Sequence, residues 1–217
     1  MSDTDSFIEE VGEEVRRDKL FKLMRKYGWI AILLVLLMVG GAAFNEYRKA
    51  RAISEAQAFG DAILAALQAD DPAARAAELD AIDASGTSAG ILSFVSAGVK
   101  AGTDDRKSAI GQLQAVAQDT TMPEVYRHLA ELKLILLQGD DLPVAERMAR
   151  LEPLMVAGAP FRLLAEEQMA MILIADGDVE AGLSRLQSIL ADGDVTAGLR
   201  RRASQLIVAL GGELQPA

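Results

Sequence analysis

An uninterrupted hydrophobic stretch lies near the amino end of the chain. From Gly28 to Phe44, nine of the 17 residues are Leu, Ile, Val or Phe, and none is charged. As a helix this stretch would be about 25 Å long, which is at the short end of what crosses a bilayer. A core helix of a soluble protein normally shows a polar stripe at helical spacing, and this stretch has none. The pattern therefore predicts a transmembrane helix over residues 27–47.

Bulky apolar side chains of this helix are the expected membrane anchor: Trp29, Ile30, Leu33, Leu36, Leu37 and Phe44. A cleaved secretion signal is the alternative, because the small residues "GGAA" precede Phe44. The 26 residues before the apolar run are unusually many for such a signal, so we favour an uncleaved anchor. Six basic residues precede the helix and three follow it, which predicts a cytoplasmic amino terminus. We therefore expect a single-pass protein of the bacterial inner membrane whose carboxyl-terminal part is periplasmic.

The segment before the anchor, residues 1–26, is acidic and then basic. Residues 1–15 hold six acids and no base, whereas residues 16–26 hold six bases and one acid. Phe7, Ile8 and Val11 fall on one side of a helix, which predicts an amphipathic cytoplasmic tail. Two interpretations stay open. The tail is either a solvated segment whose basic end contacts anionic lipid headgroups, or a docking helix for a cytoplasmic partner.

Beyond the anchor the hydrophobic pattern is helical throughout. No proline or glycine cluster interrupts the chain as far as Gln68, so the anchor helix should continue into a helical linker over 48–71. Apolar residues at helical spacing then predict helices over 72–84, 89–101, 104–118, 123–138, 142–157, 160–176, 179–191 and 195–210. No convincing strand-like alternation is present. The predicted fold class is all-α, with a transmembrane helix followed by a helical repeat domain, an α-solenoid, over 72–217.

Small and bulky residues recur at matching places in successive helix pairs, as in α-helical repeats. Small residues occupy Ala170 and Gly182 in the last pair, and Gly98 and Ala109 in an earlier pair. A small residue on each helix lets the two helices approach closely, and bulky neighbours fill the space between them. The corresponding bulky positions are Leu113, Val116, Leu173, Leu186 and Ile189. The pattern is typical of degenerate tetratricopeptide repeats.

Charge and composition exclude several classes of function. The net charge is −10, and residues 52–217 hold 24 acids against 13 bases. An acidic domain of this kind repels phosphate backbones, so we expect no nucleic-acid partner. The chain contains no cysteine, which rules out disulfides and thiolate metal sites.

The sequence contains patterns that resemble catalytic and metal-binding motifs, but an inter-helix loop and helix caps explain them better. "GTSAG" at 86–90 matches the G-x-S-x-G nucleophile elbow, with His128 further along, but Ser88 would need a strand before it. The residues before the motif are expected to form a helix rather than a strand. We therefore interpret 86–90 as an inter-helix loop and keep a serine hydrolase using Ser88 as a remote alternative. "DGD" at 176–178 and 192–194 lacks the glycine and glutamate of a calcium loop, and helix capping explains both. We expect no enzyme activity, cofactor or metal.

The acidic-then-basic segment "FIEEVGEEVRRDKLFKLMRKYG", one anchor helix and the degenerate repeats together resemble a bacterial group. The chain is similar to the tetratricopeptide-repeat-like family that includes the ancillary subunit of the SecYEG translocon. This resemblance implies an inner-membrane protein with a periplasmic helical-repeat domain. It also implies association with translocon subunits and with a membrane-anchored periplasmic chaperone.

Stacked repeat hairpins form a curved surface whose first helices line the concave side. By their place in the repeat, five residues are candidates to face a protein-binding groove: Tyr126, Leu129, Lys133, Glu167 and Met171. The predicted function is a membrane-anchored protein–protein interaction module at the periplasmic side of the translocon. A structural scaffold in cell-envelope or division assembly is the alternative.

Overall fold

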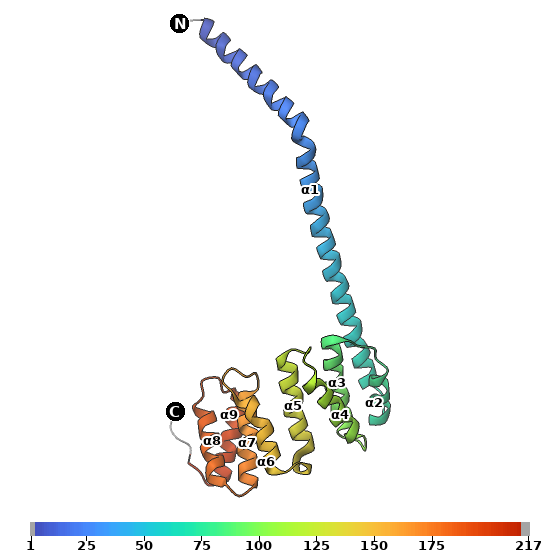
Figure 1. Ribbon diagram of the computed structural model, residues 1–217, viewed down its shortest axis with the longest axis vertical. Helices are drawn as coiled ribbons and strands as arrows, with labels where there is room; N and C mark the ends of the chain where they lie inside the picture. The colour runs from blue at the N-terminus through green and yellow to red at the C-terminus, as the bar shows by residue number, and fades with distance from the viewer. Residues whose placement is uncertain (1–2, 214–217) are drawn as a thin grey trace. The chain divides into compact units, whose positions relative to one another are not determined.

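A computed structural model of the chain describes residues 3–213, and within them the side chains of residues 21–213 other than 23 and 31 (Figure 1). All regular secondary structure in this range is helical, so the predicted all-α class is confirmed for the described residues. The chain divides into two compact units, Met1–Asp61 and Ala62–Ala217, and we refer to the second as the repeat domain. The side chains on which the amphipathic-tail prediction depends lie outside those described.

Helix α1, Asp3–Leu67, is continuous over 65 residues (Figure 1). It ends one residue before the predicted end at Gln68, in agreement with the lack of a proline or glycine cluster. The six predicted anchor side chains lie on this helix and all are exposed, from 38% at Ile30 to 66% at Leu37. The last turns of α1 belong to the repeat domain, where Ile63 and Ala66 are buried.

The repeat domain continues as short helices joined by tight turns (Figure 1). The α-helices that follow α1 are α2 Pro72–Asp80, α3 Gly86–Lys100, α4 Arg106–Gln118, α5 Glu124–Gln138, α6 Val144–Leu151, α7 Arg162–Ala175, α8 Val179–Ala191 and α9 Ala197–Ala209. Two 3-10 turns, η1 Gly139–Asp141 and η2 Glu152–Met155, follow α5 and α6. Consecutive helices pack against each other, as the predicted hairpins require.

Three predicted bounds are wrong by several residues. The helix expected over 72–84 ends at Asp80. The helix expected over 142–157 is an α-helix only to Leu151 and then tightens into η2, because Pro153 lacks the N–H that would continue the α-helical pattern. The helix expected from residue 89 begins at Gly86, so "GTSAG" forms its first turns and is not an inter-helix loop.

Side-chain caps explain several of the helix starts. Asp71 accepts a hydrogen bond from the Ala74 N–H at 2.8 Å, and Asp178 accepts one from the Ala181 N–H at 3.1 Å. The turn before Asp178 needs positive φ, which Gly177 supplies at 98°. The first "DGD" is thus a stop and cap signal, as predicted. The second begins at Asp192, the C-cap of α8, but it does not cap the next helix, because Thr196 caps α9.

The close helix approach predicted for the last hairpin is present between α7 and α8. A Cβ atom on Gly182 would lie 2.4 Å from Ile174 Cγ1 and 2.9 Å from the Ala170 carbonyl oxygen. The prediction for Gly98 is wrong, since this residue is exposed and a Cβ there would meet nothing within 4 Å. Its neighbour Ala97, 2% exposed, is the small residue packed inside the domain.

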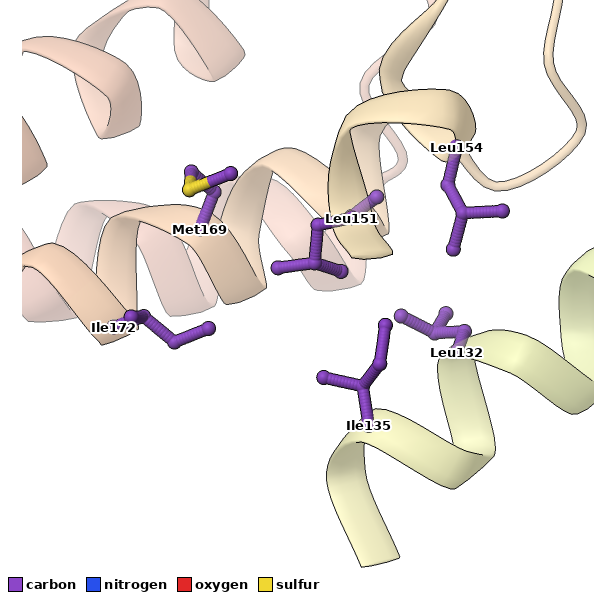
Figure 2. Close-up of a cluster of buried hydrophobic side chains, with 7 residues drawn as sticks. Leu132, Ile135, Leu151, Leu154, Met169 and Ile172 are labelled. Atoms are coloured by element: carbon purple, nitrogen blue, oxygen red, sulfur yellow. The ribbon is translucent and has the colours of Figure 1, made fainter. Parts of the chain in front are cut away.

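Bulky residues of successive helices form the core between the hairpins. Figure 2 shows Leu132 and Ile135 of α5 pointing towards Leu151 and Leu154, which lie on α6 and η2. Met169 and Ile172 of α7 belong to the same cluster (Figure 2), as does Ala165. A second cluster joins α7, α8 and α9 and consists of Ala170, Leu186, Ile189, Leu199, Ala203 and Ile207. The apolar faces of the helices are therefore used against one another.

A polar contact ties α2 to α3. The Lys100 ammonium is buried, with 4% exposure, and donates to both Asp80 carboxylate oxygens at 2.7 and 2.8 Å. Ser96 and Gln112 also donate to Asp80. Burial alone would raise the pKa of Asp80, but these hydrogen bonds and the charge of Lys100 outweigh it and hold the pKa below its usual value.

Candidate protein-binding groove

A well-formed cavity of the repeat domain lies among α5, α7 and α9. It has a volume of about 650 Å³ and is lined by Leu132, Leu136, Leu164, Glu167, Gln168, Met171, Arg202, Gln205, Leu206 and Ala209. Leu136 is 52% exposed, Met171 45% and Leu164 36%, so large apolar side chains face solvent there. Apolar patches of this kind on a folded surface mark interaction sites.

A smaller cavity of about 260 Å³ lies beside α3 and α5. Its lining residues are Phe94, Ala97, Gly98, Ala101, Leu113, Lys133, Leu136 and Leu137. Leu136 lines both cavities, so the two are neighbours across α5. We call the residues that line either cavity the apolar groove. Most of it comes from α3, α5, α7 and α9, which are alternate helices of the repeat domain, as expected when the first helix of each hairpin faces one side.

One ion pair sets the electrostatics of the larger cavity. Arg202 of α9 donates from Nε and Nη2 to the two carboxylate oxygens of Glu167, at 2.8 and 2.7 Å. Glu167 is only 4% exposed, and the bidentate pair satisfies its charge inside the domain. The hydrogen bond to Glu167 raises the pKa of Arg202 above its usual value. The pair also joins α7 to α9 across 35 residues of sequence.

Of the five predicted groove residues, three line one of the two cavities and two line neither. Glu167 and Met171 line the larger cavity, and Lys133 lines the smaller one. Tyr126 stacks on Phe94, with ring centroids 6.2 Å apart and an angle of 21° between the planes. It lines neither cavity, and nor does Leu129, which is half-buried.

Several lining residues were not among those predicted. Leu136 is one helical turn from Lys133, and Gln168 is one turn from Met171, so helical spacing from the predicted residues would have found both. Arg202 carried no such signal. In the sequence it belongs to a basic "LRRR" run, and only the folded chain brings it to Glu167.

A third cavity, of about 360 Å³, contrasts with the apolar groove. It lies among α4, α5 and α6 and is lined by Gln114, Ala117, Gln118, Glu131, Leu134, Gln138, Glu146 and Arg150. Arg150 donates to Glu131 Oε1 at 2.6 Å and to Gln138 Oε1 at 2.8 Å. Arg150 thus has polar partners within the cavity, and six of the eight lining residues are polar or charged.

The patterns considered for catalysis do not form a reactive site at Ser88. This serine lies in the first turn of α3 and follows a loop rather than a strand, so the strained turn of a nucleophile elbow is missing there. His128 lies on α5, where its Nε2 is 3.4 Å from Glu124 Oε1 of the preceding turn. Among the described residues, no group of three or more His, Asp or Glu side chains is placed to hold a metal ion.

One helical segment of the described residues, Met24–Leu67, is long and apolar enough to cross a membrane by length and composition. Its most apolar part has a mean hydropathy of 2.2 and none of it is buried against other parts of the chain. Comparison with curated proteins and with solved structures finds no match. The sequence profile of one family, described as tetratricopeptide repeat-like domain, matches residues 24–158, which is more than half of the chain. The protein therefore belongs to the tetratricopeptide repeat-like domain family.

Proposed function

We propose that the protein is a membrane-anchored protein–protein interaction module that binds its partner in the apolar groove. Tetratricopeptide repeat-like domains generally mediate contacts between proteins and are typically non-catalytic. The observation that carries the proposal is the exposure of Leu136, Leu164 and Met171 together along one cavity. Burying these side chains against a partner would contribute free energy in proportion to the apolar area removed from water.

The membrane anchor in this proposal is residues 27–47 of α1. Support comes from the apolar side chains around this segment, such as Trp29 and Leu36, which are 62% and 63% exposed. Nine Leu, Ile, Val and Phe residues favour insertion by about −3 to −5 kcal/mol in total. The excess of basic residues before the segment favours a cytoplasmic amino terminus and a periplasmic repeat domain. Anchoring confines the groove to the membrane surface and raises its effective concentration near a membrane partner.

The partner in this proposal is the bacterial Sec translocon, with a membrane-anchored periplasmic chaperone as a second contact. The support is the order of parts along the chain, which resembles the ancillary translocon subunit. These parts are an acidic-then-basic amino-terminal segment, one apolar helix and degenerate helical repeats. A domain tethered in this way would sit where translocated chains and their chaperones emerge.

Photo-crosslinking in intact cells tests this function. A photoreactive amino acid replaces Met171 in the groove or, as a matched control, Ser184, which is exposed on α8 and lines neither cavity. We expect crosslinks to translocon subunits or a periplasmic chaperone from position 171 and not from position 184. Crosslinks from position 171 to wall-synthesis or division proteins would instead support an envelope scaffold. Identical neighbours from both positions would contradict binding in the groove.

A further inference from the structure

The charged residues of the apolar groove are few and unevenly paired. Among the residues that line its two cavities, only Lys133, Glu167 and Arg202 carry a charge. Glu167 and Arg202 neutralise each other through their bidentate pair. Lys133 has no carboxylate oxygen within 4.0 Å among the side chains that the structure describes. Among the described side chains, Lys133 is therefore a positive charge of the groove without a carboxylate partner.

The surroundings of the Lys133 ammonium favour its pairing with an acidic side chain of a partner. Its side chain is half-buried and shares the smaller cavity with the apolar residues Phe94, Leu136 and Leu137. An ammonium group that is partly removed from water is stabilised when a carboxylate pairs with it. The rest of the domain is acidic, with 24 acids against 13 bases in residues 52–217. An acidic side chain of a partner is therefore attracted at Lys133 and repelled over most of the remaining surface.

We propose that the apolar groove binds a protein segment in which an acidic side chain lies close to bulky apolar side chains. The acid pairs with Lys133, and the apolar side chains fill the larger cavity beside Leu136 and Met171. Lys133 and Leu136 are one turn apart on α5, where Cβ atoms are about 5–6 Å apart. The acid and the first apolar anchor of the partner are thus one helical turn apart in a helical segment, or two residues apart in an extended one. This inference rests on the proposed function.

Peptide selection on the full chain in detergent tests it. From short random peptides displayed on phage, binders are selected separately on the wild type, on Lys133→Glu and on Lys107→Glu. Lys107 is the matched control because it is exposed on α4, outside both cavities, and its substitution changes the charge equally. We expect wild-type binders to be enriched in Asp or Glu next to apolar residues. Lys133→Glu should remove this enrichment, and Lys107→Glu should leave it intact.

Affinities of a selected peptide make the test quantitative. By fluorescence anisotropy, we expect about tenfold weaker binding when Lys133 becomes Glu, and a similar loss when the acid of the peptide becomes its amide. The peptide substitution keeps the test valid if Lys133→Glu fails to fold. Equal binding of the acidic and amide peptides, or an equal effect of Lys133→Glu and Lys107→Glu, would overturn the inference.

Met171→Asp separates this inference from the proposed function. Loss of all peptide binding in Met171→Asp, without any acid preference in the wild type, would overturn the inference and leave the proposed function standing. Peptide binding that is unaffected by Met171→Asp would overturn both. A second copy of the chain is the competing occupant. Light scattering that shows a dimer in the wild type and a monomer in Met171→Asp would also overturn the inference.

Discussion

The apolar segment of α1 and the helices of the repeat domain are built from the same residue types, yet they use them differently. In α8, Leu186 and Ile189 lie on one face and are fully buried, while Ser184 and Ser188 on the same helix are exposed. In α1, Leu33, Leu36 and Leu37 lie in a segment that has no polar stripe, and all three are exposed. A helix with one apolar stripe buries that stripe by packing on its neighbours, whereas a helix that is apolar all round is typical of a membrane span or of the core of a large protein.

The largest effect that separates the two regions comes from removing a core leucine. Leu186→Ala leaves a cavity among α7, α8 and α9, so we expect the free energy of unfolding to fall by about 2–5 kcal/mol. Leu36→Ala in α1 removes the same atoms from an exposed position and should leave unfolding of the repeat domain unchanged. Urea unfolding of the full chain in detergent, followed by circular dichroism, compares them. Equal losses in the two variants would contradict the distinction.

A smaller effect is expected where two helices touch. In Gly182→Ala the new methyl group would meet Ile174 and the Ala170 carbonyl, so we expect a loss of about 1–3 kcal/mol. Gly98→Ala is the matched control in α3. It adds the same methyl group to open space and should stabilise the domain by about 0.5–1 kcal/mol, because glycine is a poor helix former. Thermal unfolding should show a lower melting temperature for Gly182→Ala and a higher one for Gly98→Ala than for the wild type.

These two glycines also show where prediction from sequence succeeds and where it ends. Ala170 lies between two bulky residues, Met169 and Met171, and Gly182 matches it at repeat spacing on the next helix, so the pattern identified this contact. In α3, Ser96, Ala97 and Gly98 are three small residues in a row. Spacing alone does not say which of them packs inside the domain, and only the folded chain shows that Ala97 is buried and Gly98 exposed.

The positions of the helices were predictable because they depend on signals within each segment of the sequence. Caps, glycines and apolar spacing are local signals, and they predicted each α-helix described in the repeat domain, although three of the bounds differ by several residues. Local signals do not reveal contacts between distant residues, such as Arg202 with Glu167, and the groove depends on those. Tyr126 illustrates the limit, because its helix position does not reveal that its ring stacks on Phe94, a lining residue of the smaller cavity.

A pH-dependent effect is expected from the ion pair between α2 and α3. The pKa of Asp80 is lowered in the folded state, so the pair stabilises the fold above the unfolded pKa of about 3.9. This stabilisation is lost as the pH falls through the folded-state pKa. Because Asp80 is itself half exposed, water screens the pair, and we expect Asp80→Asn to cost about 1–2 kcal/mol at neutral pH.

Unfolding measured from neutral to acidic pH checks this prediction. The difference in unfolding free energy between the wild type and Asp80→Asn should shrink as the pH falls below about 4. A difference that stays constant with pH would mean that the charge of Asp80 does not stabilise the fold.

The smallest effect on stability is expected in the apolar groove. Met171 is 45% exposed, so Met171→Asp should change the free energy of unfolding by less than about 0.5 kcal/mol. The same substitution should abolish the groove-specific crosslinks to a partner. Calorimetry of the purified variant measures the first effect. A large loss of stability would show that Met171 supports the fold and is not free to bind.

The central proposal is that the apolar segment of α1 lies in lipid and holds the repeat domain outside the cytosol. Alkaline phosphatase, which is active only after export, and β-galactosidase, which is active only in the cytosol, are each fused to the carboxyl end and assayed in intact cells. The account predicts an active phosphatase and an inactive β-galactosidase, both in the membrane fraction. An active β-galactosidase with an inactive phosphatase would contradict it.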